Sequence, residues 1–190
     1  MKVRDVFLLF FLVVMCVQLH AQERTLKKVK IICGENNRNR KNNAETRIEL
    51  KAGMKSPDFK YRDVNGKLIS LKDLRGKYVL IDFWATWCGP CCMEIPHLKQ
   101  LEKDLEGKNI VFVGISCDKD WNTWKSFVEK NQLVGIQLNV EGDKSFIKAY
   151  KANWIPRFVL LNKKGKIVNP DLWWPSSGVL YEFLIGLKGI

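Results

Sequence analysis

Two cysteines separated by two residues are the side chains in this sequence best suited to chemistry. They belong to a five-residue motif made of Trp87, Cys88, Gly89, Pro90 and Cys91. Thiols at this spacing can close a small disulfide and reopen it, and a thiolate is the species that attacks the disulfide of a substrate. We expect Cys88 to make this attack and Cys91 to resolve the mixed disulfide that it forms. The motif therefore indicates a redox centre.

The residues around the motif predict that it joins a buried strand to a helix. Residues 78–84 (Tyr-Val-Leu-Ile-Asp-Phe-Trp) are almost all apolar, as in a strand that is covered on both faces. Free N–H groups and partial positive charge at the start of a helix favour a thiolate on Cys88. Pro90 fits the first helical turn, where a missing N–H costs little. Apolar residues then recur at helical spacing as far as about residue 106: Ile95, Leu98, Leu101 and Leu105.

Two acidic residues near the motif are candidates for proton transfer. Asp82 lies within the apolar strand, where an ionised carboxylate is costly, so its pKa should rise. Beneath the thiols it could exchange a proton with Cys91, and the alternative is a strand-edge Asp that faces water. Glu94 follows Cys91 by three residues and shares its helix face. The alternative for Glu94 is a solvated acid near a helix N-terminus.

A proline precedes a later predicted strand over residues 157–161. Trp154, Ile155 and Pro156 lead into that strand, and a proline in this position usually forms only a turn. A cis Ile155–Pro156 bond would instead be a deliberate feature that lays backbone beside the thiols.

The other cysteines leave a metal-binding alternative open. Cys92 makes a second spacing with Cys88, Cys-x-x-x-Cys, which could hold copper. No histidine follows His97 to complete such a site, so we interpret Cys92 as a partly buried helix residue and Cys117 as a buried strand-end residue. We therefore predict no metal and no cofactor beyond the redox-active disulfide.

The N-terminus has the pattern of an export signal. Lys2 and Arg4 precede an apolar run over residues 7–17, and Ala21 offers a small residue at the cleavage point. We expect residues 1–21 to be the signal and the protein to be exported to the periplasm. The alternative is an uncleaved anchor, which would associate the protein with the membrane.

The positive charge is unevenly distributed along the chain. Lys and Arg total 32 against 20 Asp and Glu, a formal net charge of +12. Basic residues are concentrated in residues 22–52, a polar and partly disordered segment by composition. A solvated basic arm is the default interpretation, and nucleic acid is a poor explanation for an exported protein.

Residues 53–190 have the pattern of one α/β domain. Strands alternate with helices, which predicts a mixed central sheet covered on both faces. An Asn65-Gly66 turn predicts a β-hairpin at the start of this domain. The remaining predicted elements are a helical turn at 71–74, strands at 110–116 and 166–168, and helices at 121–130, 144–150 and 179–187, the last capped by Ser177.

With these residues in place, the sequence is identified as a member of the thioredoxin superfamily. Residues 81–91 closely resemble the thioredoxin active site, Pro96 matches the kink of that family's helix, and Ile155-Pro156 matches its cis-proline loop. The spacing Cys91-x-x-Glu94-x-Pro96 and the lead-in at residues 56–59 are similar to the exported TlpA/ResA branch.

The resemblance implies a thioredoxin-like fold with an N-terminal β-hairpin extension, and a role for each site residue. Cys88 would be the nucleophile and Cys91 the resolving thiol, while Asp82 and Glu94 would handle protons. Members of this branch typically reduce disulfides outside the cytoplasm, some of them in cytochrome c maturation. The implied partners are proteins that contain disulfides and an upstream electron donor in the membrane or periplasm. Substrate would meet Trp87, Gly89, Pro90, Ile155 and Pro156.

Two other functions are compatible with the motif. A peroxiredoxin-like thiol peroxidase has a similar lead-in but attacks peroxide with a lone cysteine. A non-enzymatic copper-binding module would use Cys88 and Cys92.

Overall fold

The computed structural model describes residues 50–190. The predicted signal (1–21) and nearly all of the basic segment (22–52) lie outside the described residues. The strands of the described part are β1 (Lys60–Asp63), β2 (Leu68–Ser70), β3 (Tyr78–Trp84), β4 (Ile110–Ser116), β5 (Ile136–Asn139), β6 (Arg157–Leu161) and β7 (Ile167–Asn169). The helices are η1 (Leu71–Leu74), α2 (Gly89–Asp104), α3 (Trp121–Lys130), α4 (Lys144–Ala149), η2 (Pro175–Ser177) and α5 (Val179–Ile185).

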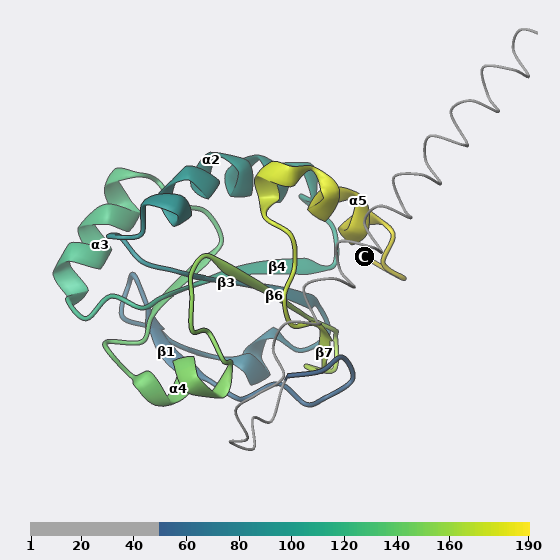
Figure 1. Cartoon of the computed structure of the whole chain (residues 1–190), viewed down its shortest axis with the longest axis horizontal. Coiled ribbons are helices and arrows are strands. Elements are labelled where there is room, and N and C mark those ends of the chain that lie inside the picture. The colour runs from purple at the N-terminus through teal and green to yellow at the C-terminus, as the bar shows by residue number, and fades with distance from the viewer. Residues whose placement is uncertain (1–49) are drawn as a thin grey trace, which may run out of the picture. The chain divides into compact units, whose positions relative to one another are not determined.

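The seven strands of residues 50–190 form one mixed sheet in the order β2-β1-β5-β4-β3-β6-β7 (Figure 1). The apolar strand β3 lies between β4, to which it is parallel, and β6, to which it is antiparallel. The predicted α/β fold class, with a mixed sheet and helices on both faces, is confirmed. The edge strands β2 and β7 are three residues long, shorter than the strands between them.

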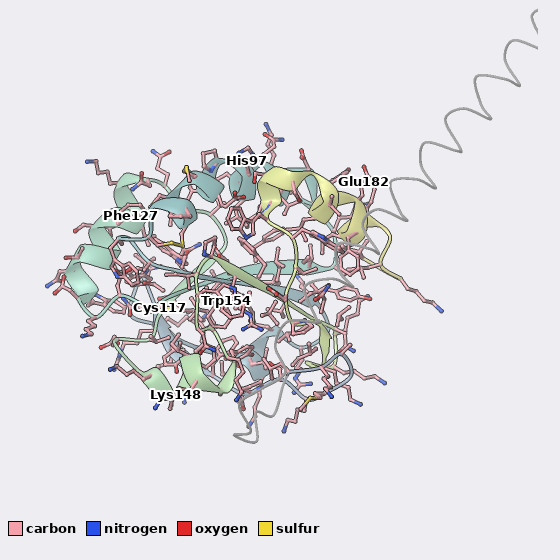
Figure 2. The ribbon with its side chains drawn as sticks, viewed as in Figure 1. His97, Cys117, Phe127, Lys148, Trp154 and Glu182 are labelled. Atoms are coloured by element: carbon pink, nitrogen blue, oxygen red, sulfur yellow. A yellow bond between two sulfur atoms is a disulfide. The ribbon has the colours of Figure 1, made fainter. Side chains whose placement is uncertain are left out.

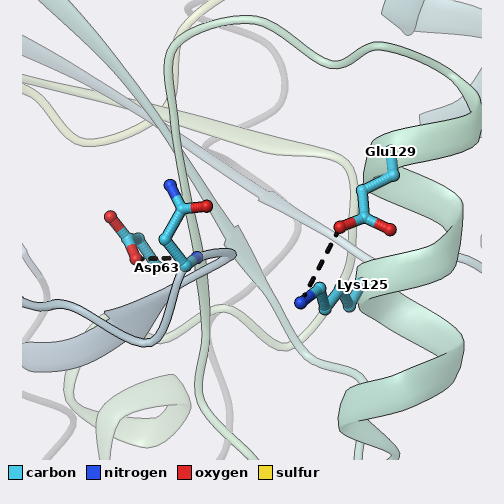
Figure 3. A network of polar contacts seen from close by, with 4 residues as sticks. Asp63, Lys125 and Glu129 are labelled. Carbon is cyan, nitrogen blue, oxygen red and sulfur yellow. Dashed lines mark hydrogen bonds and ion pairs between the residues drawn. The ribbon is translucent and has the colours of Figure 1, made fainter.

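The predicted hairpin joins the sheet as its outermost pair of strands. Gly66 adopts a positive φ of 80°, which glycine tolerates without a steric penalty. The Asp63 carboxylate accepts hydrogen bonds from the backbone N–H groups of Asn65 and Lys67, each at 2.9 Å, and so closes the turn. Figure 3 shows Asp63 with one of these bonds, near the Lys125–Glu129 ion pair of α3 in that view. β1 then pairs antiparallel with β5.

The pleat of β3 divides the core between two faces of the sheet. Val79, Ile81 and Phe83 point into one apolar cluster that includes Phe146 of α4. Leu80 and its neighbours on the other face pack against α2 and α5, and Trp84 packs with residues of α3. Figure 1 shows α2 and α5 on one side of the sheet and α4 on the other. Asp82 lies between Leu80 and Trp84 in this alternation, so it faces α2.

Several element boundaries differ from the sequence predictions. β5 was not predicted, because four residues are too few to give a clear period. Ser177 does not cap the last helix: its hydroxyl donates to the Trp174 carbonyl at 2.6 Å, and Gly178, with a φ of 71°, takes the N-cap position. α2 ends at Asp104 and α5 at Ile185, each two residues earlier than expected.

None of the helices in residues 50–190 is both long and apolar enough to cross a bilayer.

Candidate redox site

The disulfide between Cys88 and Cys91 lies where β3 gives way to α2. Cys88 is the N-cap residue of α2, and its Sγ accepts a hydrogen bond from the backbone N–H of Cys91 at 3.2 Å. Pro90 lies in the first turn, as the sequence predicted. Cys88 is 6% exposed and Cys91 3%, so the outer cysteine is only slightly more accessible than the inner one. Charge on a reduced Cys88 would lie at the positive end of the α2 dipole.

Asp82 lies under α2 and shares a cavity of about 40 Å³ with Cys91. The residue is half-buried, but its Oδ1 atom is fully enclosed and has no hydrogen-bond partner. Burial, and secondarily the charge of Glu94, raises the pKa of Asp82 to about 8. The alternative of a strand-edge Asp is wrong, because β3 has a partner strand on each side. Asp82 can therefore exist in either protonation state near neutral pH.

Glu94 is buried, not solvated. It is 4% exposed, and its two carboxylate oxygens accept hydrogen bonds from the backbone N–H (2.9 Å) and the hydroxyl (2.7 Å) of Ser176. These bonds tie η2 to α2, which are 82 residues apart in the sequence at this contact. Glu94 thus anchors the segment before α5 and also places negative charge near Asp82.

The Ile155–Pro156 peptide bond is cis, as the alternative interpretation of this proline required. β6 pairs with β3 so that Arg157 lies opposite Phe83, which brings the preceding loop to the end of β3 beside the motif. Ile155 packs against the cluster that contains Cys88 and Cys91, and Pro156 is buried.

The exposed rim of the site consists of motif residues. Trp87 is 69% exposed, and Gly89 and Pro90 are also exposed. A buried disulfide beside an exposed indole and a loop backbone offers a partner a surface on which to dock. That Trp87, Gly89, Pro90, Ile155 and Pro156 contact substrate stays a prediction.

Two buried charged residues that sequence reasoning missed hold the loops around the site. Arg157 donates from Nε (3.1 Å) and Nη2 (2.9 Å) to the Pro170 carbonyl and from Nη1 to the Lys151 carbonyl. It thereby ties together two loops next to the cis-proline. An arginine that opens an otherwise apolar strand was the available signal.

Asp118 holds the segment before the motif in place through hydrogen bonds. Its carboxylate accepts from the Thr86 backbone N–H (3.0 Å), the Thr86 hydroxyl (2.8 Å) and the Ser116 hydroxyl (2.6 Å). These bonds cross from the end of β4 to the residues that follow β3, and so fix the approach to Trp87 and Cys88.

The two free cysteines of the described region are poor nucleophiles. Burial raises the pKa of Cys92, and burial followed by the charges of Asp118 and Asp82 raises the pKa of Cys117 to about 12. Cys92 is partly buried, as predicted, whereas Cys117 is half-buried rather than enclosed. Cys33 lies outside the described residues.

Within residues 50–190 no three His, Cys, Asp or Glu side chains are grouped to hold a metal ion. Figure 2 shows His97 on the outer side of α2, away from the sheet.

Comparison with known proteins relates this geometry to a family. The model of the family described as Redoxin matches residues 51–172. The chain belongs to the Redoxin family. A thiol-disulfide oxidoreductase ResA of Bacillus cereus is 32% identical over 120 residues, which cover 63% of this chain and 69% of that protein.

Solved structures of thiol-disulfide oxidoreductases are similar to this chain. A solution structure of a Bacteroides vulgatus protein is 45% identical, with a TM-score of 0.63, and the match covers 79% of this chain and 94% of the other. The thioredoxin domain of a Bacteroides vulgatus thiol-disulfide oxidoreductase is 28% identical, with a TM-score of 0.65 and coverage of 71% and 99%. This Redoxin-family chain is therefore a thiol-disulfide oxidoreductase, similar to ResA within the thioredoxin superfamily.

Proposed function

We propose that this protein reduces the disulfides of other proteins outside the cytoplasm, with Cys88 and Cys91 as its dithiol. The observation that carries the proposal is the arrangement of the pair. Cys88 caps a helix that favours its thiolate, and Cys91 lines the same cavity as a carboxyl group whose pKa is about 8. One cysteine is thus equipped to attack and the other to lose a proton.

The reaction follows from this arrangement in two exchanges. The Cys88 thiolate attacks one sulfur of the substrate disulfide, a Cys88–substrate bond forms, and the departing substrate thiolate takes a proton from solvent. Asp82 then accepts the proton of Cys91, and the Cys91 thiolate attacks Cys88 Sγ and releases the second substrate thiolate. The substrate gains two electrons, and the enzyme is left with the Cys88–Cys91 disulfide.

The oxidised enzyme needs a donor to restore its dithiol. We propose a membrane or periplasmic electron donor and protein clients that dock on Trp87, Gly89, Pro90 and the Ile155–Pro156 loop. The export pattern of residues 1–21 supports the location, either as a cleaved signal or as an anchor. Apocytochromes c awaiting haem attachment are candidate clients, by analogy with the branch that this chain resembles.

Cysteine variants and a reduction potential test the proposal together. We expect Cys88→Ser to abolish insulin reduction and Cys91→Ser to accumulate mixed disulfides, while Cys92→Ser, the matched control, keeps wild-type turnover. Equilibration with glutathione or dithiothreitol should give a potential near or below about −250 mV. A potential near about −120 mV would make the protein an oxidant instead.

The two alternative functions, a thiol peroxidase and a copper-binding module, predict different results. Stoichiometric consumption of peroxide by the pure protein would support a peroxidase. Tight copper binding that survives Cys91→Ser and is lost in Cys92→Ser would support a metal carrier.

A further inference from the structure

A row of three residues crosses the sheet beneath the redox site. The strand register places Asp82 of β3 beside Gly114 of β4, and Gly114 beside Gln137 of β5. Residues paired in this way lie on the same face of a sheet. All three line the cavity that also contains Cys91. Asp82 and Gln137 therefore face the same small space from strands that are not direct neighbours.

The missing side chain of Gly114 allows the Gln137 amide to lie across β4. A Cβ atom on Gly114 would stand 2.2 Å from Gln137 Oε1 and 3.0 Å from Nε2, closer than such contacts permit. Gln137 Nε2 donates to the Val134 carbonyl at 2.7 Å, and this bond fixes which end of the amide is the nitrogen. The oxygen is thus the end that lies over Gly114, between Gln137 and Asp82.

Two acceptor atoms in this row have no donor. Asp82 Oδ1 and Gln137 Oε1 are both buried and both without a hydrogen-bond partner. A carboxylate oxygen and an amide oxygen cannot bond to each other, but one water can donate a hydrogen to each. The cavity volume of about 40 Å³ exceeds the roughly 15 Å³ that a water needs, and two polar partners are enough to hold it.

We propose that a water in this cavity bridges Asp82 and Gln137, and that Gln137 is a positioning residue for the proton that Asp82 exchanges with Cys91. The inference deepens the proposed function and rests on it for the role of Cys91. In the resolving step the Cys91 proton moves to Asp82. Asp82 then passes a proton to the water, and the water releases one outward.

Glu102 of α2 is the outer end of this route. It lines the same cavity and is half-buried, and burial raises its pKa to about 6, so its carboxylate can take a proton and return it to solvent. The other titratable groups that face Asp82 or the cavity are Cys91, Glu94, Lys99 and Cys117. The Lys99 ammonium donates to the Asn131 carbonyl, at 2.5 Å, so it is directed to the loop after α3.

A substitution that keeps the volume of Gln137 tests the bridge. Gln137→Met removes the amide oxygen and so the second anchor of the water. In the oxidised protein, carboxyl carbon NMR titration should then show Asp82 to be about a tenfold weaker acid, because its ionised form loses a hydrogen bond. Gln100→Met makes the same chemical change on the exposed face of α2 and should leave Asp82 unchanged.

Gly114→Ala supplies an independent perturbation, because its methyl group must push the Gln137 amide away from β4. It should shift the Asp82 titration in the same direction as Gln137→Met. An Asp82 titration that neither variant moves would overturn the proposal. These measurements use the oxidised protein at equilibrium, so they remain decisive even if the protein proves not to reduce protein disulfides.

The wild-type protein decides the question if both variants fail to fold. A high-resolution crystal structure should contain a water within hydrogen-bond distance of Asp82 Oδ1 and Gln137 Oε1. A dry cavity would refute the bridge.

Discussion

The two faces of the sheet differ in what they leave unpaired. The face toward α4 is filled by aromatic rings in mutual contact, with Phe83 5.7 Å from Phe146 and 5.2 Å from Tyr150 between ring centroids. The face toward α2 and α3 contains all of the buried side-chain polar atoms that lack a hydrogen bond in residues 50–190: Asp82 Oδ1, Trp124 Nε1, Gln137 Oε1 and Asn139 Nδ2.

This difference shows how one strand serves stability and chemistry at once. Successive residues of β3 point to opposite faces, so Ile81 and Phe83 complete an apolar core while Asp82, between them, reaches the redox cavity. The unpaired polar atoms cost stability where they lie. The α4 face has none of them among the described residues, so its apolar packing is free of this cost.

The largest effect is expected from the apolar face. Phe83→Ala removes a fully buried ring and should lower the free energy of unfolding by about 4 kcal/mol, measured by urea denaturation. Because Phe83 points away from the cavity, the Asp82 titration should not move. A shift of that titration in Phe83→Ala would break the comparison between the faces.

The next effect concerns the charge on the other face. The folded-state pKa of Asp82, about 8, is above its unfolded value of roughly 4, so the folded protein binds the extra proton between these pH values. The stability that Asp82 contributes is therefore present at acidic pH and is lost as pH rises toward 8. Linkage bounds this loss at about 5 kcal/mol, because the pKa differs by roughly four units between the two states. Asp82→Asn should remove the loss, but its amide still lies where an oxygen has no hydrogen-bond partner, so we expect it to be more stable than wild type by roughly 3 kcal/mol above pH 8.

Thermal and urea unfolding across pH 4 to 9 measure this effect. The exposed Asp104→Asn is the matched control and should keep the wild-type decline. Because Glu102 also has a raised pKa, of about 6, the deciding quantity is the difference in stability between wild type and Asp82→Asn. A difference that stays constant from pH 4 to 8 would show that Asp82 ionises as freely in the folded protein as in the unfolded chain.

The smallest expected effect on stability concerns two adjacent serines, only one of which bonds to a buried carboxylate of the α2 face. Ser176 donates its hydroxyl to the buried Glu94 carboxylate, whereas Ser177 donates to an exposed carbonyl. Ser176→Ala should cost about 1.5 kcal/mol, as expected for a bond to a charged group, and Ser177→Ala less than about 0.5 kcal/mol. If urea denaturation gave the two variants equal losses in the free energy of unfolding, the bond from the Ser176 hydroxyl to Glu94 would contribute no more stability than the exposed bond of Ser177.

Local signals in the sequence predicted the elements next to the disulfide. The apolar run of β3, the helix after Pro90 and the turn at Gly66 each depend on a few neighbouring residues, and each was predicted at its place. Asp82 was recognised as unusual because a carboxylate in an apolar run is rare. These features need no knowledge of the tertiary fold.

Apart from the cis-proline loop and Asp82 beside Cys91, contacts between distant residues were missed. Gln137 reaches the cavity only because Gly114 lies between it and Asp82 in the sheet, a register that no local pattern reveals. The bond between Ser176 and Glu94 likewise spans 82 residues, and Ser176 gave no signal of its own. The polar partners of the site were therefore the part that sequence could not supply.

The lengths of the edge strands bear on how this protein avoids aggregation. Open strand edges are templates on which extended chains can add, and a protein proposed to handle oxidised clients would meet such chains repeatedly. Among residues 50–190, the outer edge of β7 is already paired, since Gly53 N–H donates to the Ile167 carbonyl and Ile167 N–H to the Met54 carbonyl, each at 2.8 Å. The β2 edge is three residues long and runs directly into the η1 turn. So short an edge gives an unfolded chain few backbone groups to pair with, which favours contact through side chains and brief encounters over persistent β-addition.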